Sequence, residues 1–426
     1  MEVLNFEQAK GDVYRTLLSR LDLEKLSRVS GDKARQAVGG MIREIVAGGR
    51  VPFNTAETER LQTDLLDEVF GLGPLEPLLR DPTISDILVN NKDEVYVERA
   101  GMMERVDIAF RDDRHLLQII DRIVSAVGRR VDESSPMVDA RLADGSRVNA
   151  IIPPLAIDGP TLSIRRFGRG PQTPDALIQS RSLSPEMLEL LGAAVRARIS
   201  ILISGGTGAG KTTLLNALSR FIPENQRIVT IEDAAELQFS RPNCVRLETR
   251  MANVEGQGAV RQRQLLINSL RMRPDRIIIG EVRGDEAFDM LQAMNTGHEG
   301  SMCTIHSNSP RDALTRLESM VAMANLNIPE KAVRQQIASA IRIVIQIARL
   351  SDGTRKVVNI SEIAGIDENV VSMHEIFTFQ KKGVAANGTV VGTFQATRIR
   401  PRFLEQLRVS GVELTSGVFD RTMEVN

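Results

Sequence analysis

The residue pattern best suited to chemistry is a glycine-rich run that ends in lysine and threonine. The run comprises Gly205, Gly206, Thr207, Gly208, Ala209, Gly210, Lys211, Thr212 and Thr213. An apolar segment precedes it and a helical pattern follows, which is the strand, loop and helix order of a phosphate-binding loop. Glycines let backbone amides wrap around phosphates, and a helix start favours an anion. We therefore expect Lys211 to reach the β- and γ-phosphates of a nucleotide and the Thr212 hydroxyl to bind Mg²⁺.

Carboxylates follow two other apolar runs. PDRIIIGE ends in Glu281, and a strand-end carboxylate is what a phosphate site needs to hold the metal and order the attacking water. Asp275, earlier in that run, reads equally as a turn or cap residue. TIEDAAEL carries Glu232, Asp233 and Glu236, which must be solvated, paired or near a cation. A solvated corner is the simple alternative, but a nucleotide site would still lack a general base.

Two histidines lie in the segment NTGHEGSMCTIHSNSP. His298 and His306 are too widely spaced, and too short of further ligands, to predict a zinc site. A sensor that hydrogen-bonds the γ-phosphate is a better use of an imidazole there. Structural histidines are the alternative.

Arginines crowd residues 241 to 283. They are Arg241, Arg246, Arg250, Arg261, Arg263, Arg271, Arg273, Arg276 and Arg283. Such a run is commonly a solvated face, but an arginine from a neighbouring subunit can also stabilise charge on a γ-phosphate. Arg246 and Arg250 are the positions that we favour for that role.

Composition narrows the class of protein. The chain has 426 residues, enough for two or three domains, with 42% hydrophobic and 26% charged residues. Its 54 basic and 55 acidic residues, and its 4% aromatic content without Trp, argue against a nucleic-acid partner. Cys244 and Cys303 predict neither a disulfide nor a zinc site, and we expect both thiols to be buried. Neither a signal peptide nor an apolar run of roughly 18 residues is seen, so a cytoplasmic location is expected.

The elements that must position these residues fall into three regions and a linker. We expect a helical domain at 1–70, a mixed α+β domain at 71–168, a linker at 169–178 and an α/β domain at 179–426. The expected helices are 6–22, 32–49, 55–73 and 115–128. The expected strands are 84–90, 94–99, 200–205, 227–233, 275–281 and 302–307. The apolar strands of the last domain predict a parallel sheet.

Four motifs in fixed order resemble those of a known superfamily. GGTGAGKT, TIEDAAE, RPDRIIIGE and TGHEGSMCTIHS are similar to the Walker A, Asp, Walker B and His boxes of the secretion ATPases, and the resemblance covers roughly residues 70 to 380. LETR, LRMRPDRIIIGEVRGDEAFDMLQAMNTGHEGSM and DGTRKVVNISEI look most like the tight-adherence (Tad) pilus ATPases, often called CpaF-type. The resemblance implies a RecA-like P-loop NTPase motor domain after a PAS-like N-terminal domain.

The resemblance also implies roles for individual residues. Lys211 and Thr212 would bind ATP and Mg²⁺, Glu232 would be the catalytic base, and Glu281 would help to hold Mg²⁺ through water. His298 and His306 would be the His-box residues.

A homo-hexameric ring is implied in the same way. In such a ring the N-terminal domain of one subunit closes over the nucleotide of the next, so that Arg147, Arg165 and Arg166 contact ATP. Type II secretion relatives usually carry a tetracysteine zinc module, and the two cysteines here disfavour that branch.

The leading hypothesis is a mechanochemical ATPase that powers assembly of a tight-adherence type IV pilus, with retraction left open. It would associate peripherally with the inner membrane through platform proteins. The alternatives are a type IV secretion traffic ATPase, a nucleotide-gated scaffold and a ring-shaped DNA translocase. Scarce aromatics and a net charge of −1 count against the last of these.

Overall fold

The computed structural model describes most of the chain in two compact units. The described residues are 6–21, 31–48, 53–99, 101–142, 144–166, 173–239, 241–250, 252, 257–324 and 326–425. The units are Met1–Gly168 and Arg169–Asn426. Residues 169–172 of the expected linker lie outside the described residues.

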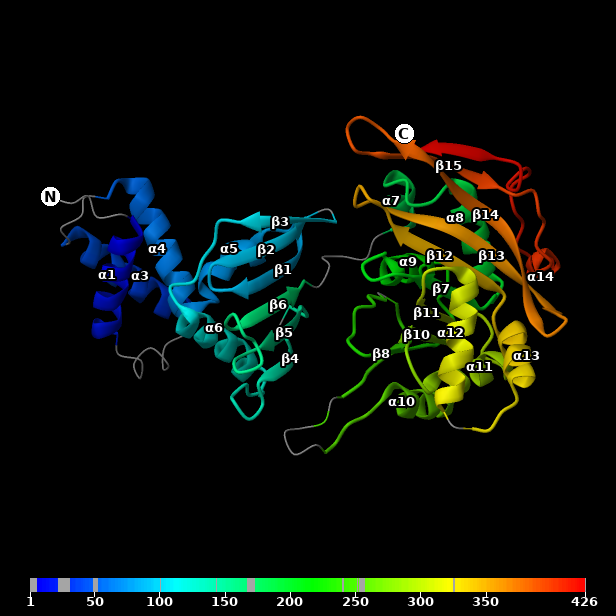
Figure 1. Ribbon diagram of the computed structural model, residues 1–426, viewed down its shortest axis with the longest axis horizontal. Helices are drawn as coiled ribbons and strands as arrows, with labels where there is room; N and C mark the ends of the chain where they lie inside the picture. Colours follow the sequence, from blue (N-terminus) through cyan, green and yellow to red (C-terminus); the bar gives the residue numbers. More distant parts are fainter. Residues whose placement is uncertain are drawn as a thin grey trace. The chain divides into compact units, whose positions relative to one another are not determined.

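The first unit begins with three helices, coloured blue in Figure 1. They are α1 (Phe6–Arg20), α3 (Gly31–Ala47) and α4 (Thr55–Phe70). Leu17, Ile42 and Leu65 lie in their shared core and are fully buried. Helix α4 starts at a capping box in which Asn54 and Glu57 bond each other's backbone amides, which fixes its first residue. These helices confirm the three N-terminal helices predicted from the sequence.

An antiparallel sheet follows in the same unit, in the order β3-β2-β1-β6-β5-β4. Its strands are β1 (Ile84–Asn91), β2 (Glu94–Arg99), β3 (Met102–Val106), β4 (Met137–Arg141), β5 (Arg147–Ile151) and β6 (Thr161–Arg165). Its helical elements are η1 (Gly73–Leu75), α5 (Glu76–Arg80) and α6 (Asp113–Ala126). Ile119 and Ile123 of α6 share a core with Ile87 and Val97, so α6 covers one face of this sheet.

The second unit is built on a ten-stranded mixed sheet, in the order β16-β15-β14-β13-β12-β7-β11-β10-β8-β9. The strands are β7 (Ile201–Gly205), β8 (Ile228–Glu232), β9 (Cys244–Glu248), β10 (Arg276–Val282), β11 (Met302–His306), β12 (Ile343–Arg349), β13 (Arg355–Asp367), β14 (Val370–Val384), β15 (Val390–Ala396) and β16 (Thr422–Val425). The six strands from β12 to β9 are parallel, as the sequence predicts. Strands β13 to β16 extend the sheet in antiparallel pairs and were not expected.

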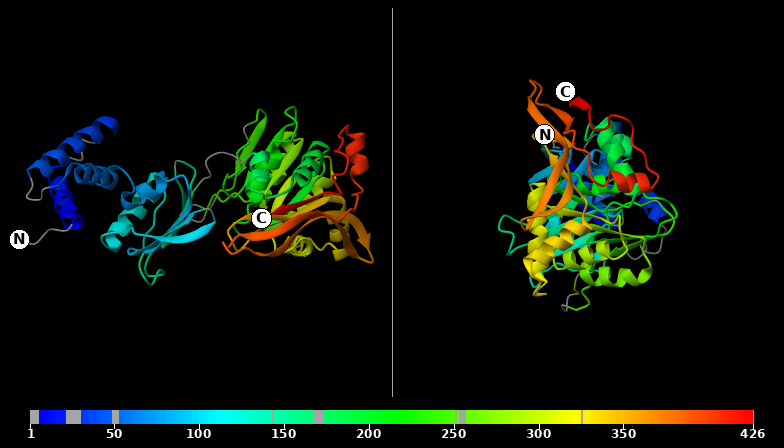
Figure 2. Two further views of the ribbon diagram at one scale, coloured as in Figure 1. Left: turned by 90° about the horizontal axis from the view of Figure 1, so that it is seen from above. Right: turned by 90° about the vertical axis from the view of Figure 1, so that its right-hand side faces the viewer.

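Helices cover both faces of this sheet. They are α7 (Pro174–Gln179), α8 (Pro185–Arg196), α9 (Lys211–Ser219), α10 (Gln262–Ser269), η2 (Leu270–Met272), α11 (Glu286–Asn295), α12 (Pro310–Met323), α13 (Glu330–Ala340) and α14 (Leu404–Val409). Residues of α7, α8, α9 and α14 pack in one core, and residues of α10 to α13 pack in the core on the other face. The yellow helices and the red α14 accordingly lie on opposite faces in Figure 2.

Two expectations need correction. Residues 174–178 of the expected linker are helical, because the Thr173 side chain caps α7 and Pro174 takes its first position. Cys303 is buried as expected, but Cys244 is only half-buried because β9 is an edge strand. Every helix within the described residues is too short or too polar to cross a membrane.

Candidate functional site

The glycine-rich run forms a tight loop between β7 and α9. Gly208 has a φ of +67° and Gly210 a φ of +99°, a left-handed backbone that favours glycine. Lys211 is 9% exposed, and its Nζ donates to the carbonyl oxygens of Gly205 and Gly206, both at 3.0 Å. The first turn of α9, whose backbone amides have no acceptor within the helix itself, begins at this loop. The backbone therefore forms a concave, positively polarised cradle that suits phosphate.

His306 connects the loop to the neighbouring strands. It ends β11 and lies beside Gly205 in the parallel register. Its Nε2 lies 3.0 Å from the Thr207 hydroxyl oxygen, and its Nδ1 lies 3.5 Å from Lys211 Nζ. Its Nδ1 also lies 3.5 Å from the Glu281 Oε1. One imidazole thus contacts the loop, the lysine and the strand-end carboxylate.

Glu281 lies near the end of β10 and is kept ionised. Burial alone would raise the pKa of this carboxyl, but Arg283, Lys211 and His306 together lower it below its usual value. The guanidinium of Arg283 donates to the Glu281 Oε2 at 3.0 Å and lies 3.3 Å from the Asp233 Oδ2. A charged carboxylate beside the phosphate cradle is a suitable oxygen ligand for Mg²⁺ or for its water.

Glu232 has the opposite electrostatic character. It ends β8, is 3% exposed, and burial raises its carboxyl pKa to about 7, against lowering by the backbone amides of Leu237 and Glu236 and the charge of Arg246. Those amides donate to Oε2 at 2.9 Å and 2.8 Å. Within the described part of the chain, Oε1 has no hydrogen-bond partner. A fixed carboxyl that titrates near neutral pH has the properties of a general base.

Gly280 makes room for Glu232. A Cβ built on Gly280 would lie 2.9 Å from the Glu232 Cγ, so any side chain there would displace the carboxyl group. The Thr304 hydroxyl donates to the Gly280 carbonyl oxygen at 2.6 Å and fixes this backbone position from β11. The sequence pattern did not single out Gly280 or Thr304. Arg283 was named only as one of the crowded arginines, and its position two residues after Glu281 was the signal for their contact.

His298 is not brought to the phosphate loop. His298 precedes β11, whereas His306 is the last residue of that strand, so the two histidines lie at opposite ends of β11. The His298 Nδ1 instead lies 3.2 Å from the carbonyl oxygen of Ala293, at the end of α11. Within this chain His298 therefore lies away from the phosphate loop, because each residue of the intervening strand adds about 3.3 Å, and its role as a γ-phosphate sensor stays a prediction.

The two arginines favoured as fingers lie on β9 or just after it. Strand β9 is an edge strand of the sheet and does not neighbour β12 or β7. Arg246 lies on β9 opposite Thr230, and its charge lowers the pKa of Glu232 in its own chain. The Arg250 Nε donates to the Gly258 carbonyl oxygen at 2.6 Å. Both side chains are exposed.

The three arginines of the first unit lie on or beside its sheet. Arg147 and Arg165 are cross-strand partners on β5 and β6, and the Arg165 Nε donates to the Asp86 Oδ1 at 3.0 Å. The Arg166 guanidinium donates to the carbonyl oxygens of Asp81 and Ile84. Their contact with a nucleotide stays a prediction.

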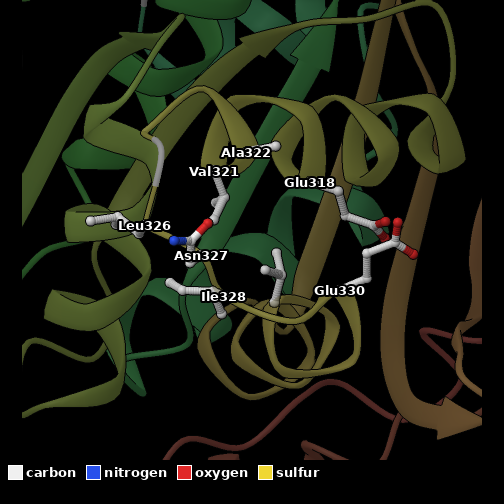
Figure 3. Close-up of a pocket in the computed structure, with 8 residues that line it drawn as sticks. Glu318, Val321, Ala322, Leu326, Asn327, Ile328 and Glu330 are labelled. Carbon is white, nitrogen blue, oxygen red and sulfur yellow. The ribbon is translucent and has the colours of Figure 1, made fainter.

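A separate pocket of about 220 Å³ lies between α12 and α13. Figure 3 draws the residues that line it, which are Glu318, Val321, Ala322, Leu326, Asn327, Ile328, Glu330 and Val333. Its two carboxylates lie at one end, where Arg334 donates to both. None of the residues discussed above lines this pocket, so it is not the phosphate site.

A phosphate loop at the end of a central parallel strand, with an ionised and a weakly acidic carboxyl group on neighbouring strands, defines a P-loop ATPase. Residues 68–402 match the family described as Type II/IV secretion system protein. The chain belongs to this family of ATPases.

Two relatives that this chain matches over most of their own length are named for conjugal transfer and for type IV secretion. A putative conjugal transfer protein of Mycobacterium tuberculosis is 40% identical over 303 residues, which are 70% of this chain and 86% of the relative. The type IV secretion system protein VirB11 of Brucella suis is 32% identical over 322 residues, 69% of this chain and 89% of the relative. The pilus retraction motor PilT, solved with bound ADP, has a similar fold at 17% identity, with a TM-score of 0.50, over 80% of this chain and 86% of that one.

Proposed function

We propose that this ATPase is the motor of a type IV secretion or conjugation machine. The observation that carries the proposal is the similarity, over 86% to 89% of their own lengths, to proteins named for conjugal transfer and type IV secretion. The two site carboxylates support turnover rather than nucleotide-gated scaffolding, because one suits a metal ligand and the other a base.

A tight-adherence pilus motor of CpaF type is the second candidate. The family match begins at residue 68, and the helices α1, α3 and most of α4 lie before it. A helical N-terminal domain of this kind fits the tight-adherence and the type IV secretion branches alike, so the motif spellings alone support the pilus candidate. The proposed domains are the helical 1–70, the α+β 71–168 and the motor 179–426.

Each residue of the site suggests a different role in ATP hydrolysis. Bound Mg²⁺ would supply positive charge to the phosphates, and the Thr212 hydroxyl and Glu281 would hold it or its waters. Lys211 would exchange the carbonyl oxygens of Gly205 and Gly206 for phosphate oxygens. Glu232 would use Oε1 to take a proton from the attacking water, while the amides on Oε2 keep the carboxyl group in place.

We propose that the active form is a homo-hexamer on the cytoplasmic side of the inner membrane, where it acts on membrane platform proteins. In that ring Arg246 or Arg250, and Arg147, Arg165 and Arg166, would contact the nucleotide of a neighbour. His306 would sense the γ-phosphate through its contacts with Thr207 and Lys211.

The first test is steady-state ATPase activity of the wild type beside Glu232→Gln, with particle mass recorded with and without an ATP analogue. The motor proposal expects a six-subunit wild type that hydrolyses ATP, and a variant that keeps the ring but loses most turnover. A wild type that binds ATP without hydrolysing it would favour the scaffold alternative.

A second test separates the two machines. In the native host, the gene would be deleted and complemented with the wild type or Glu232→Gln. Loss of conjugation or protein secretion supports the leading proposal, whereas loss of surface pili alone supports the pilus motor.

A further inference from the structure

Two arginines of the β12–β13 hairpin lie against the phosphate loop. Arg349 ends β12 and Arg355 begins β13, and they are direct partners in the antiparallel register. The Arg355 Nε donates to the Gly208 carbonyl oxygen at 2.9 Å. A Cβ built on Gly208 would lie 3.7 Å from the Arg349 Nη1, and one built on Gly210 would lie 3.2 Å from the Arg355 Cδ. The hairpin therefore brings two guanidinium-bearing side chains to the glycines of the loop.

The turn between these strands is firmly held. Asp352 Oδ1 accepts from the amide and the hydroxyl of Thr354, at 3.0 Å and 2.7 Å. Its Oδ2 accepts from the Val390 amide at 2.8 Å, which ties the turn to β15. The held turn therefore keeps Arg349 and Arg355 next to each other, on the same side of the phosphate loop.

The position of the hairpin indicates which part of the nucleotide it faces. Strand β7 has β11 on one side and β12 on the other. The groups suited to hydrolysis, His306, Glu281 and Glu232, all lie on β11 and the strands beyond it. The γ-phosphate must lie near those groups, and the phosphate chain is extended. The nucleoside end must then lie toward β12, where the two arginines are.

We propose that Arg349 and Arg355 bind the nucleoside side of the nucleotide, through the α-phosphate and the face of the purine ring. A guanidinium group is always charged, bonds phosphate through several donors and stacks on planar rings. The chain has no Trp and few aromatic residues, so a guanidinium is a suitable stacking partner for the base. Arg355 also braces the loop through Gly208. The inference rests on the proposed ATP site and adds the residues of its far end.

The test is calorimetric titration of the full chain with ADP and, separately, with pyrophosphate, which has no nucleoside. Arg349→Ala and Arg355→Ala are compared with the wild type. Arg342→Ala is the matched control. This exposed arginine directly precedes β12, at the opposite end of the strand from Arg349. Thermal unfolding of each variant verifies that it is folded.

We expect both loop-side variants to bind ADP about tenfold or more weakly, as expected for hydrogen bonds to a charged group, and Arg342→Ala to bind it like the wild type. Pyrophosphate would occupy the β- and γ-phosphate positions, away from Arg349, so its affinity should change by less than about twofold in Arg349→Ala. Unchanged ADP affinity in both variants would overturn the proposal, as would an equal loss for ADP and pyrophosphate in Arg349→Ala.

Arg355→Gln distinguishes a role of Arg355 in nucleotide binding from its hydrogen bond to the Gly208 carbonyl oxygen. Glutamine keeps a donor for the Gly208 carbonyl oxygen but removes the charge, so ADP affinity should stay low. Recovery to the wild-type affinity would assign Arg355 to bracing alone and overturn its part of the proposal. Because ADP binding needs no turnover, a wild type without ATPase activity would contradict the motor proposal and leave this test intact.

Discussion

At the scale of single residues, the two carboxyl groups of the site differ in acidity because their neighbours differ. Glu281 has a guanidinium, an ammonium and an imidazole beside it, and its pKa is lowered despite burial. Glu232 has mainly backbone amides as partners, and burial raises its pKa to about 7. Pairs of groups whose acidity is separated in this way commonly divide the roles of a reaction between them.

The raised pKa of Glu232 predicts how stability depends on pH. Between about 4.5 and about 7 the folded protein keeps a proton that the unfolded chain has lost, so the free energy of unfolding falls as pH rises through this window. The loss is complete above pH 7 and amounts to about 3 kcal/mol. Glu232→Gln should therefore raise the melting temperature of the nucleotide-free protein by several degrees at pH 8 and by little at pH 4.5. Equal effects at both pH values would contradict the assignment.

The histidines offer a matched pair of substitutions. His306→Ala removes contacts with Thr207, Lys211 and Glu281, and we expect kcat to fall about tenfold to a hundredfold. His298→Ala, at the opposite end of β11, should change kcat by less than about threefold in the isolated chain. Steady-state ATPase assays at saturating ATP measure both. A larger loss in His298→Ala would restore the role that the sequence suggested for it.

At the scale of elements, the sequence predicted the strands that are continuous runs of apolar residues. Strands β7, β8, β10 and β11 are buried on both faces, so their apolar runs are plain in the sequence. Strand β14 has exposed and half-buried residues along much of its length, and its mixed pattern gave no such signal. The predicted parallel direction already puts His306 at the same end of its strand as the loop, but the pairing of β11 with β7 is a tertiary fact that the sequence pattern does not give. Helix α7 did have a signal, Thr followed by Pro and Asp.

Gly280→Ala tests how closely β10 and β8 approach. The new methyl group would meet the Glu232 Cγ at 2.9 Å, so we expect kcat to fall about tenfold or more and stability to fall by about 1 to 3 kcal/mol. Gly383→Ala on β14 is the control, because its Cβ would meet nothing within 4 Å. ATPase assays and thermal melts compare them. Wild-type turnover in Gly280→Ala would show that the position of Glu232 tolerates displacement.

At the scale of the whole molecule, the chain consists of two units, each with hydrophobic cores of its own. The run with Gly and Pro at 169–178 placed this division in the sequence. The proposed hexamer and the proposed membrane machine have no counterpart in one chain's composition or spacing, and both proposals rest on family membership and on the relatives.

Separate cores predict separate unfolding. Calorimetry of the nucleotide-free protein should show two transitions, and ADP at a hundred times its Kd should shift only the one that belongs to the second unit, by about 2.7 kcal/mol of added stability. A fragment of residues 169–426 identifies that transition. A single transition that ADP shifts as a whole would mean that the units unfold together.

The unequal burial of the two cysteines makes the natural chain suitable for site-selective labelling. Burial raises the pKa of the Cys303 thiol to about 12, and this side chain is fully enclosed, so reagents such as maleimides will not reach it in the folded protein. Cys244 is partly exposed on the edge strand that flanks Glu232. A fluorophore on Cys244 would place one reporter per chain at the start of β9, opposite Ile228 of β8, without any engineered mutation.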